Sequence, residues 1–297
     1  MPDPIEIPAA YLAMPRWWHE GEDWLASLPA TIADSCDRWN ITLDGEPMHG
    51  SNALVLPVRR EGVPLALRLT PPDDRTAAEI DALRYWDGRG TARLIDADPV
   101  HGLSLLERLH GEQTLADRPL EEAMPTIARL LRRMALPDPP PAVPHTSDLV
   151  RARLDTIPIE WETLDRPFDR GILDSALAVG ERLTKPGDTL AVNGDLHCEQ
   201  VLRADREPWL AVDPVLLRGD PAYDLARVLW TRLDEMPDAA AIRHWLDVLV
   251  AEAGLEPDRA LSWVRFRTAD YWLWGLTYGL TEDPPRCARL IEALGPA

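Results

Sequence analysis

The spacing of hydrophobic and polar positions changes along this chain and divides it into two parts. Residues 53–58 and 64–70 are short apolar runs separated by a polar segment that contains glycine, which is the pattern of a β-hairpin. Residues 76–86 carry apolar side chains at helical spacing. Two further apolar runs, at 92–95 and 103–106, complete a small antiparallel sheet with one helix against it.

From about residue 112 the helical period dominates. Residues 125–136 follow the i, i+3, i+4, i+7 rule behind Pro125, a residue suited to the first turn of a helix. The five prolines of 137–144 predict an extended linker. Two β-like runs, 189–192 and 209–212, interrupt helical patterns that lie near 148 and 172 and over 221–234, 239–254 and 257–280. There is no internal repeat.

These patterns predict an α+β protein with two lobes. We place a small antiparallel-sheet lobe with an N-terminal helical segment in residues 1–109, and a larger, mainly helical lobe in residues 110–297. With 297 residues, 45% of them hydrophobic, and 12 tryptophans, the chain has enough apolar material for a core in each lobe.

The charge balance limits the kinds of binding partner that the protein can have. There are 31 Lys plus Arg against 50 Asp plus Glu, so the formal charge is −19, which excludes a typical nucleic-acid binder and favours cations. No apolar run has the length of a membrane span, and residues 1–24 lack the pattern of a signal peptide, so we expect a cytoplasmic protein. Cys36, Cys198 and Cys287 are too few and too scattered for a disulfide framework, and we expect reduced thiols.

Only one lysine, Lys185, is present among the 31 basic residues. Chemistry that requires a lysine therefore has a single candidate, and it lies in a Pro-Gly loop.

The most informative stretch follows the two β-like runs of the second lobe. Asp195 comes just after the first run, Gln200 five residues later, and Asp213 directly after the second run. Phosphoryl transfer needs one carboxylate to orient or deprotonate the attacking hydroxyl, and an amide oxygen with a second carboxylate to hold the magnesium that bridges the nucleotide phosphates. We expect a strand-loop-strand hairpin to bring the three side chains together.

The chain resembles the aminoglycoside phosphotransferase family, specifically its streptomycin 6-kinase and hydroxyurea kinase branch, which shares the protein kinase-like fold. The resemblance covers most of the chain. Its motifs, in order, are WLASLP, RW before the first strand, RYWDGRGTARLIDAD, LLERL, GDLH, WLAVDP and GDPAYDLARVLW. Each is weak alone, but their order and spacing are specific.

The resemblance implies a role for each matching residue. Asp195 would be the catalytic base, and Gln200 and Asp213 would bind Mg²⁺. Arg68 would contact the phosphates of ATP or GTP, and Glu79 would orient that cation. The segment from Glu107 to Leu109 would be the hinge that contacts the nucleotide base through its backbone, while Asp220 and Asp224 would stabilise the catalytic loop.

Three positions depart from the family pattern. Arg68 stands where the family has a lysine, and because its planar fork differs from an ammonium group we expect altered nucleotide handling. Gln200 stands for an asparagine and keeps the amide oxygen. Asn193 replaces a histidine at a position we expect to be structural.

Other features have two interpretations. Taken alone, Asp195 or the Asp213-Pro214 pair is typical of a turn. Residues 45–52 lack a complete phosphate-loop pattern, so the sequence favours neither a loop that covers the nucleotide phosphates nor one that does not. His197 and Cys198 have no further ligands at zinc spacing, which favours packing over a metal site. We expect core positions for Trp272, Trp274 and Tyr278, with a substrate-stacking wall as the alternative; Asp270, Glu282 and Asp283 are expected to be solvated surface residues, with cation binding as the alternative.

We therefore expect a kinase that transfers the γ-phosphoryl group of ATP or GTP to a hydroxyl of a small molecule. The resemblance implies an aminoglycoside-type acceptor. Another hydroxylated metabolite or antibiotic, or a non-catalytic nucleotide-binding protein, remains an alternative. We expect no nucleic-acid, membrane or obligate protein partner.

Overall fold

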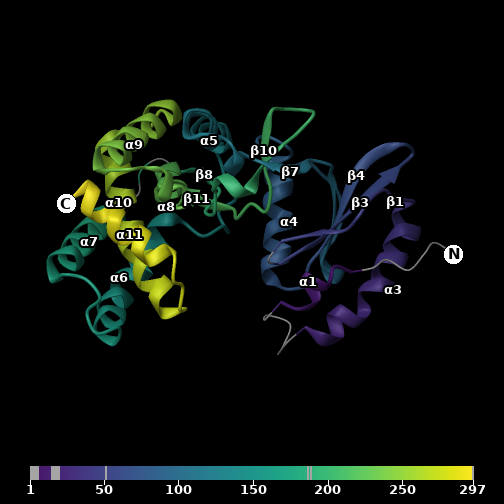
Figure 1. Cartoon of the computed structure of the whole chain (residues 1–297), viewed down its shortest axis with the longest axis horizontal. Helices are drawn as coiled ribbons and strands as arrows, with labels where there is room; N and C mark the ends of the chain where they lie inside the picture. The colour runs from purple at the N-terminus through teal and green to yellow at the C-terminus, as the bar shows by residue number, and fades with distance from the viewer. Residues whose placement is uncertain (1–6, 15–20, 51, 186, 188, 296–297) are drawn as a thin grey trace. The chain divides into compact units, whose positions relative to one another are not determined.

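The structure is a computed structural model that describes residues 7–14, 21–50, 52–185, 187 and 189–295. Ser51 of the glycine-bearing segment, parts of the N-terminal stretch and part of the loop after Lys185 lie outside the described residues. The chain forms two compact units, with the division between His110 and Gly111; Ala204–Arg206 belong to the first unit. Figure 1 shows a sheet-rich first unit and a mainly helical second unit.

The first unit is built around an antiparallel sheet with strand order β1-β3-β4-β6-β5, to which β2 is added beside β3. The predicted hairpin, the helix after it and the two later strands are confirmed, although the first of these strands begins at Leu94 and not at Ala92. Its elements are α1 (Ala9–Leu12), α3 (Glu22–Trp39), β1 (Thr42–Leu43), β2 (Met48–His49), β3 (Leu54–Arg60), β4 (Val63–Leu69), α4 (Asp74–Trp86), β5 (Leu94–Asp98), the 3₁₀ turn η1 (Pro99–His101) and β6 (Leu103–Glu107).

Strand β4 presents different residues to the two faces of this sheet. Leu65, Leu67 and Leu69 join a core that includes Leu28 and Ile32 of α3. Because side chains alternate across a strand, the residues between these leucines, Ala66 and Arg68, point to the opposite face. On that face Ala66 packs with Leu83 of α4 and Leu106 of β6. Arg68 is thereby directed toward the α4 side of the sheet.

The second unit contains helices and two small sheets, one with the strand order β10-β9-β7 and one formed by β11 and β8. Helix α10 packs against α6, α7, α8 and α11, and α5 packs against α9. The elements are β7 (His110–Thr114, which begins at the last residue of the first unit), η2 (Leu115–Asp117), α5 (Leu120–Met134), α6 (Thr146–Thr163), α7 (Arg170–Leu183), β8 (Leu190–Val192), η3 (Cys198–Gln200), β9 (Val201–Arg203), β10 (Trp209–Ala211), β11 (Leu217–Gly219), η4 (Pro221–Asp224), α8 (Leu225–Trp230), η5 (Leu233–Glu235), α9 (Ala239–Ala253), α10 (Pro257–Thr277) and α11 (Asp283–Leu294). None of the described helices combines the length and apolar composition needed to cross a bilayer.

Three expectations for this unit were wrong. Pro125 lies inside α5, which begins five residues earlier, after Pro119. The helical pattern of 221–234 is divided into a 3₁₀ turn, the short helix α8 and a second 3₁₀ turn. The two strands that precede the candidate carboxylates do not form one hairpin, since β8 pairs with β11 and β10 pairs with β9. The proline-rich segment 137–144 contains no helix, as predicted.

These two antiparallel pairs gather the loops that carry the candidate catalytic residues. Val192, at the end of β8, lies opposite Leu217, at the start of β11, so the loop after β8 meets the segment that enters β11. Ala211 of β10 lies opposite Val201 of β9, and the Val212 amide donates to the Gln200 carbonyl at 2.8 Å. The segment after β10 therefore lies beside the 3₁₀ turn that precedes β9.

Gly102 packs closely against the backbone just after β4, the strand that carries Arg68. Its φ is 69°, and a Cβ at this position would lie only 2.0 Å from the Thr70 carbonyl oxygen. Backbone cannot yield as a flexible side chain can, so we expect Gly102→Ala to lower the free energy of unfolding by about 2–4 kcal/mol in urea denaturation. Gly62→Ala is the control, since Gly62 also has a positive φ, 83°, but has nothing within 4 Å; its expected loss is about 1 kcal/mol. Equal losses would contradict the steric argument.

Candidate functional site

In the first unit, Arg68 and Glu79 form a buried ion pair. Arg68 Nη2 lies 3.0 Å from Glu79 Oε2, and the two side chains are 6% and 11% exposed. The pairing follows from the sequence, since Arg68 shares a sheet face with Ala66, and Glu79 lies one helical turn before Leu83, which packs on that face. A strand cation held by a helix carboxylate is the arrangement that protein kinases use to bind phosphates.

The predicted hinge lies at the end of β6. The Glu107 amide donates to the Arg93 carbonyl at 2.9 Å, and the Glu107 carboxylate binds the Arg206 guanidinium at 2.7 and 2.9 Å. The backbone of Leu109 makes no hydrogen bond to any residue that the structure describes. If the hinge contacts a nucleotide base, Leu109 is thus better suited than Glu107 to supply backbone groups. This contact stays a prediction.

In the second unit, Asp195 lies in the loop after β8, with both carboxylate oxygens engaged. Oδ1 is 2.7 Å from Arg227 Nε of α8, and Oδ2 accepts from Gln200 Nε2 at 3.3 Å. The side chain remains 25% exposed. Arg227 and Gln200 thus hold the two carboxylate oxygens of Asp195 in a fixed orientation, and a general base must be positioned in this way.

Asn193 and Gly194, the two residues directly before Asp195, determine the shape of this loop. Asn193 is 2% exposed, and its Oδ1 accepts from the amides of Asp195 at 3.3 Å and Val215 at 3.4 Å. One amide side chain thus links the loop after β8 to the segment that enters β11, in agreement with the expected structural role. Gly194 has a φ of 79°, and a Cβ there would crowd Leu217 at 2.9 Å, which explains the Gly-Asp sequence.

Gln200 and Asp213 have properties that suit metal ligands. Gln200 Oε1 is buried and has no hydrogen-bond partner among the described residues, although its Nε2 is bound to Asp195. Asp213 has a φ of 49°, which is rare for a non-glycine residue and rarer before a proline. Such backbone outliers concentrate at functional sites. An amide oxygen and a carboxylate fit Mg²⁺, which takes few protein ligands and completes its shell with water and phosphate oxygens.

The described residues contain no group of three or more His, Cys, Asp or Glu side chains arranged to hold a metal. His197 and Cys198 are buried, and burial together with Arg227 lowers the pKa of His197 to about 3, so this imidazole is neutral. All three cysteines are free. The expectation that His197 and Cys198 are packing residues agrees with these findings.

Asp224 lies beneath the same loop. It is 2% exposed, and burial raises its pKa to about 7, while Arg267 and backbone hydrogen bonds from Gly194 and Asn193 oppose the rise. Asp220 caps η4 by accepting from the Ala222 amide at 3.0 Å. Both aspartates are therefore placed for structural support and not for contact with a substrate.

Several other expectations need correction. Trp274 and Tyr278 are 41% and 68% exposed, so they are not core residues. Asp270 is not a solvated surface residue; it is 8% exposed and bonded to Arg153 at 2.5 Å.

Asp283 is also partly buried, with a side chain 22% exposed, and it accepts from the Tyr271 hydroxyl at 3.0 Å. Glu282 is exposed as expected. Lys185 is exposed after α7. Lys185 therefore does not lie on β4, where the family has its lysine, and Arg68 occupies that strand instead.

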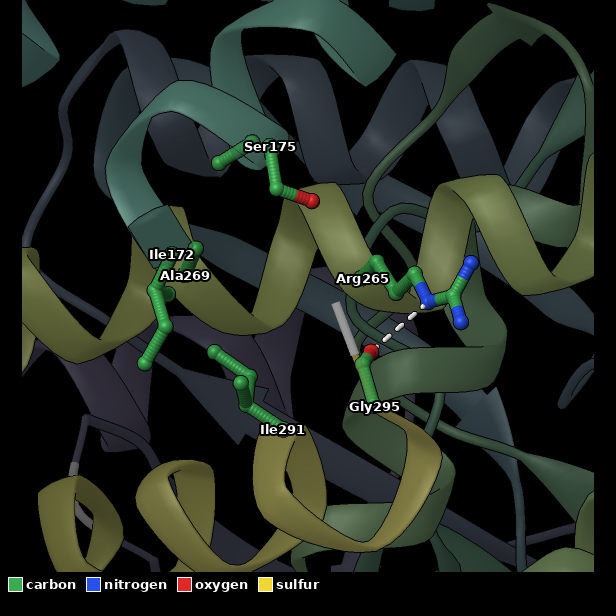
Figure 2. Close-up of a pocket in the computed structure, with 7 residues that line it drawn as sticks. Ile172, Ser175, Arg265, Ala269, Ile291 and Gly295 are labelled. Atoms are coloured by element: carbon green, nitrogen blue, oxygen red, sulfur yellow. Dashed lines mark hydrogen bonds between the residues drawn. The ribbon is translucent and has the colours of Figure 1, made fainter. Parts of the chain in front are cut away.

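The hollow shown in Figure 2 contains none of the candidate site residues. Its lining comes from α7, α10 and α11 and consists of Ile172, Ser175, Ala176, Arg265, Ala269, Ile291 and Gly295. Arg265 Nε donates to the Gly295 carbonyl at 3.1 Å, so its main polar group already has a partner. A mostly apolar hollow of this kind does not suit phosphate chemistry.

Sequence reasoning did not single out Arg227. The sequence did contain an indication of its position. Arg227 follows Asp224 by three residues, and in a helix residues three apart lie on the same face. Asp224 was expected to support the catalytic loop, and its i+3 neighbour could have been expected near that loop. The contact with Asp195 itself depends on the fold.

A strand cation paired with a helix carboxylate, and a loop that bears an acid, an amide and a second acid, are features of kinase-like phosphotransferases. The chain matches the family described as "Aminoglycoside/hydroxyurea antibiotic resistance kinase" over residues 38–279, and it belongs to this family. It is a phosphotransferase with the protein kinase-like fold, as predicted from its motifs.

Two relatives are similar to this chain in sequence, and one solved structure is similar to it in fold. The chain is 39% identical to "Streptomycin 6-kinase" of Streptomyces griseus over 282 residues, covering 93% of this chain and 92% of the relative. It is 34% identical to "Hydroxyurea phosphotransferase" of Kitasatospora aureofaciens, covering 98% and 86%. A crystal structure of aminoglycoside phosphotransferase APH(4)-Ia in a ternary complex with ADP and hygromycin B has a TM-score of 0.61 at 17% identity, covering 88% of this chain and 97% of that one.

The raised pKa of Asp224 predicts a pH dependence of stability. Its folded pKa of about 7 exceeds the ordinary value of 3.8, so the folded state binds more protons between these values. The contribution of this group is fully present below about pH 4 and is lost as pH rises through 7, with a slope of up to about 1.4 kcal/mol per pH unit. Urea unfolding at pH 5 to 8 should show that Asp224→Asn gains stability relative to wild type as pH rises. Glu199→Gln, an exposed carboxylate of the same loop, should keep the wild-type slope. Parallel curves for Asp224→Asn and wild type would contradict the assignment.

Proposed function

We propose that this enzyme transfers the γ-phosphoryl group of a nucleoside triphosphate to a hydroxyl of a streptomycin-like aminoglycoside. The observation that carries the acceptor class is the 39% identity to a streptomycin 6-kinase, which extends over more than nine-tenths of both chains. The formal charge of −19 supports a cationic acceptor, since the surface field attracts cations.

Asp195 is the proposed general base. The acceptor hydroxyl donates its proton to a carboxylate oxygen of Asp195 as its oxygen attacks the γ-phosphorus. The bond between the γ-phosphorus and the β–γ bridging oxygen breaks, and the nucleoside diphosphate leaves. Arg227 holds one carboxylate oxygen through the ion pair to Oδ1, and Gln200 holds the other through the bond to Oδ2. Both contacts support a carboxylate that is oriented before the acceptor arrives.

Arg68 is the proposed phosphate-binding cation, in place of the family's lysine. The ion pair with Glu79 fixes its guanidinium, and burial strengthens its interaction with a phosphate. We assign nucleotide binding to residues 1–109, with the hinge at Glu107 to Leu109, and catalysis and acceptor binding to residues 110–297. We also propose a cytoplasmic site of action, where nucleoside triphosphates are available.

Gln200 and Asp213 are the proposed Mg²⁺ ligands. The unpartnered Oε1 of Gln200 and the unusual backbone of Asp213 support this assignment. When bound, the ion would neutralise negative charge on the nucleotide phosphates. The donor is ATP or GTP.

Phosphorylation of hydroxyurea is a second candidate function, motivated by the 34% identity to a hydroxyurea phosphotransferase. Assays with streptomycin and with hydroxyurea, each with ATP and GTP, distinguish the two. Transfer to streptomycin with little transfer to hydroxyurea is expected. The reverse preference would replace the first proposal.

Removal of the proposed base gives a direct test. Asp195→Asn should lower kcat by about 10²- to 10⁴-fold, because an amide cannot accept the hydroxyl proton. The nucleotide Kd should change little. Glu199→Gln is the control, since this carboxylate lies in the same loop and its side chain is 76% exposed; it should retain wild-type kcat. Undiminished transfer by Asp195→Asn would remove Asp195 from the mechanism.

The arginine that replaces the family's lysine gives a second test. Arg68→Lys should bind and use nucleotide, with a changed KM or kcat, because an ammonium keeps the charge but loses the planar fork. Glu79→Gln should raise the nucleotide KM, because it removes the charge that fixes Arg68. Steady-state kinetics with circular dichroism as a folding control check both variants. Indifference of the nucleotide KM and kcat to both changes would exclude phosphate binding by Arg68.

A further inference from the structure

A series of stacked aromatic rings leads from the buried end of α8 to the surface of α10. Trp230 is fully buried and stacks on Tyr271 at 4.4 Å between ring centroids. Tyr271 stacks on Trp274 at 5.1 Å, and Trp274 contacts Tyr278 at 4.7 Å. We call Tyr271, Trp274 and Tyr278 the aromatic face.

The spacing of these residues explains why they form one surface. They lie at i, i+3 and i+7 along α10 and its C-terminal cap, which places them on one side of the helix. Their exposure rises outward, since Trp230 is buried while Trp274 is 41% and Tyr278 is 68% exposed. Trp274 and Tyr278 thus form one contiguous exposed aromatic patch, and such patches often mark binding surfaces.

The aromatic face is continuous with the candidate catalytic site. Arg227, whose Nε lies 2.7 Å from Asp195 Oδ1, has its guanidinium carbon 5.9 Å from the centre of the Tyr271 ring. Tyr271 is therefore one side chain away from Asp195. An acceptor with a hydroxyl at Asp195 can extend along Tyr271 toward Trp274 and Tyr278.

Acidic groups lie beside Tyr271, the inner residue of this face. The Tyr271 hydroxyl is bonded to Asp283 at 3.0 Å, and exposed Glu282 is its neighbour in the chain. Arg286 interacts with both carboxylates, at 3.2 and 3.6 Å, and compensates part of their charge. Aromatic faces attract planar cations, and neighbouring carboxylates add to this attraction.

We propose that the aromatic face binds a planar cationic group of the acceptor, such as a guanidinium, and so determines acceptor specificity. This inference rests on the proposed function, because it takes Asp195 as the reacting end of the acceptor site. The neutral acceptor of a hydroxyurea-type kinase would gain no cation–π stabilisation from these rings.

Substitutions in the aromatic face should separate acceptor binding from chemistry. With streptomycin as acceptor, Trp274→Ala and Tyr278→Ala should each raise the acceptor KM, and its calorimetric Kd, about tenfold. The kcat and the nucleotide KM should stay within about twofold of wild type. Tyr278→Phe keeps the ring and should restore near wild-type KM. Trp245→Ala, which removes a half-buried tryptophan of α9, should leave the acceptor KM unchanged. Unchanged KM in both alanine variants, or a Tyr278→Phe variant as weak as Tyr278→Ala, would overturn the proposal.

A test without turnover keeps this inference distinct from the proposed function. Titration of the wild-type protein with methylguanidinium should give a saturable change in tryptophan fluorescence in the millimolar range. Methylurea, which is planar but neutral, should give at least a fivefold weaker response, and Trp274→Ala should abolish the response to methylguanidinium. Because Tyr278 is the most exposed ring, Tyr278→Ala serves where Trp274→Ala fails to fold. Equal responses to the two probes would overturn the proposal, whether or not the enzyme phosphorylates streptomycin.

Discussion

The geometry of the catalytic loop depends on antiparallel pairing at both of its ends. The β8–β11 pair holds the loop after Val192, and the β9–β10 pair holds the turn that ends at Gln200. Each ladder has only three residues in each strand, so its stability comes from the helices that cover it and from Asn193, which joins the two loops. Asp195, Gln200 and Asp213 owe their placement to these short ladders and not to a single hairpin.

In the proposed mechanism an arginine, Arg68, and not a lysine binds the nucleotide phosphates from β4. Arg68 is almost fully buried, and an isolated guanidinium at such a position would be costly, so the ion pair with Glu79 offsets part of that cost as well as orienting the guanidinium. The same pair then presents a fixed cation. In the second unit Arg227 has a related double role, since it compensates Asp195 and lies beside Tyr271. In each unit an arginine thus pairs with a carboxylate of the candidate site residues.

Much of the candidate site could be predicted from the sequence because its residues follow regular elements. The family resemblance implied that Arg68 and Glu79 act as a pair, and alternation in β4 with the helical period of α4 is consistent with their facing one another. Motif order similarly identified the kinase family. The core positions expected for Trp274 and Tyr278 were wrong because composition does not reveal which face of a long helix lacks a covering partner. The same limit applies to Asp270, whose partner Arg153 is 117 residues away along the chain.

The sequence by itself determined the two-lobed α+β architecture and the phosphotransferase class, and it predicts the acid, amide and acid of the catalytic loop. These properties depend on the local hydrophobic period and on the spacing of motifs, and both can be determined from the order of residues along the chain. Only the tertiary structure decided that β8 and β10 belong to different pairs, that Arg227 contacts Asp195, and that the rings of α10 remain exposed beside that contact. Each of these depends on which distant segments pack together, and pairing between distant segments is set by the burial of whole faces and not by local sequence.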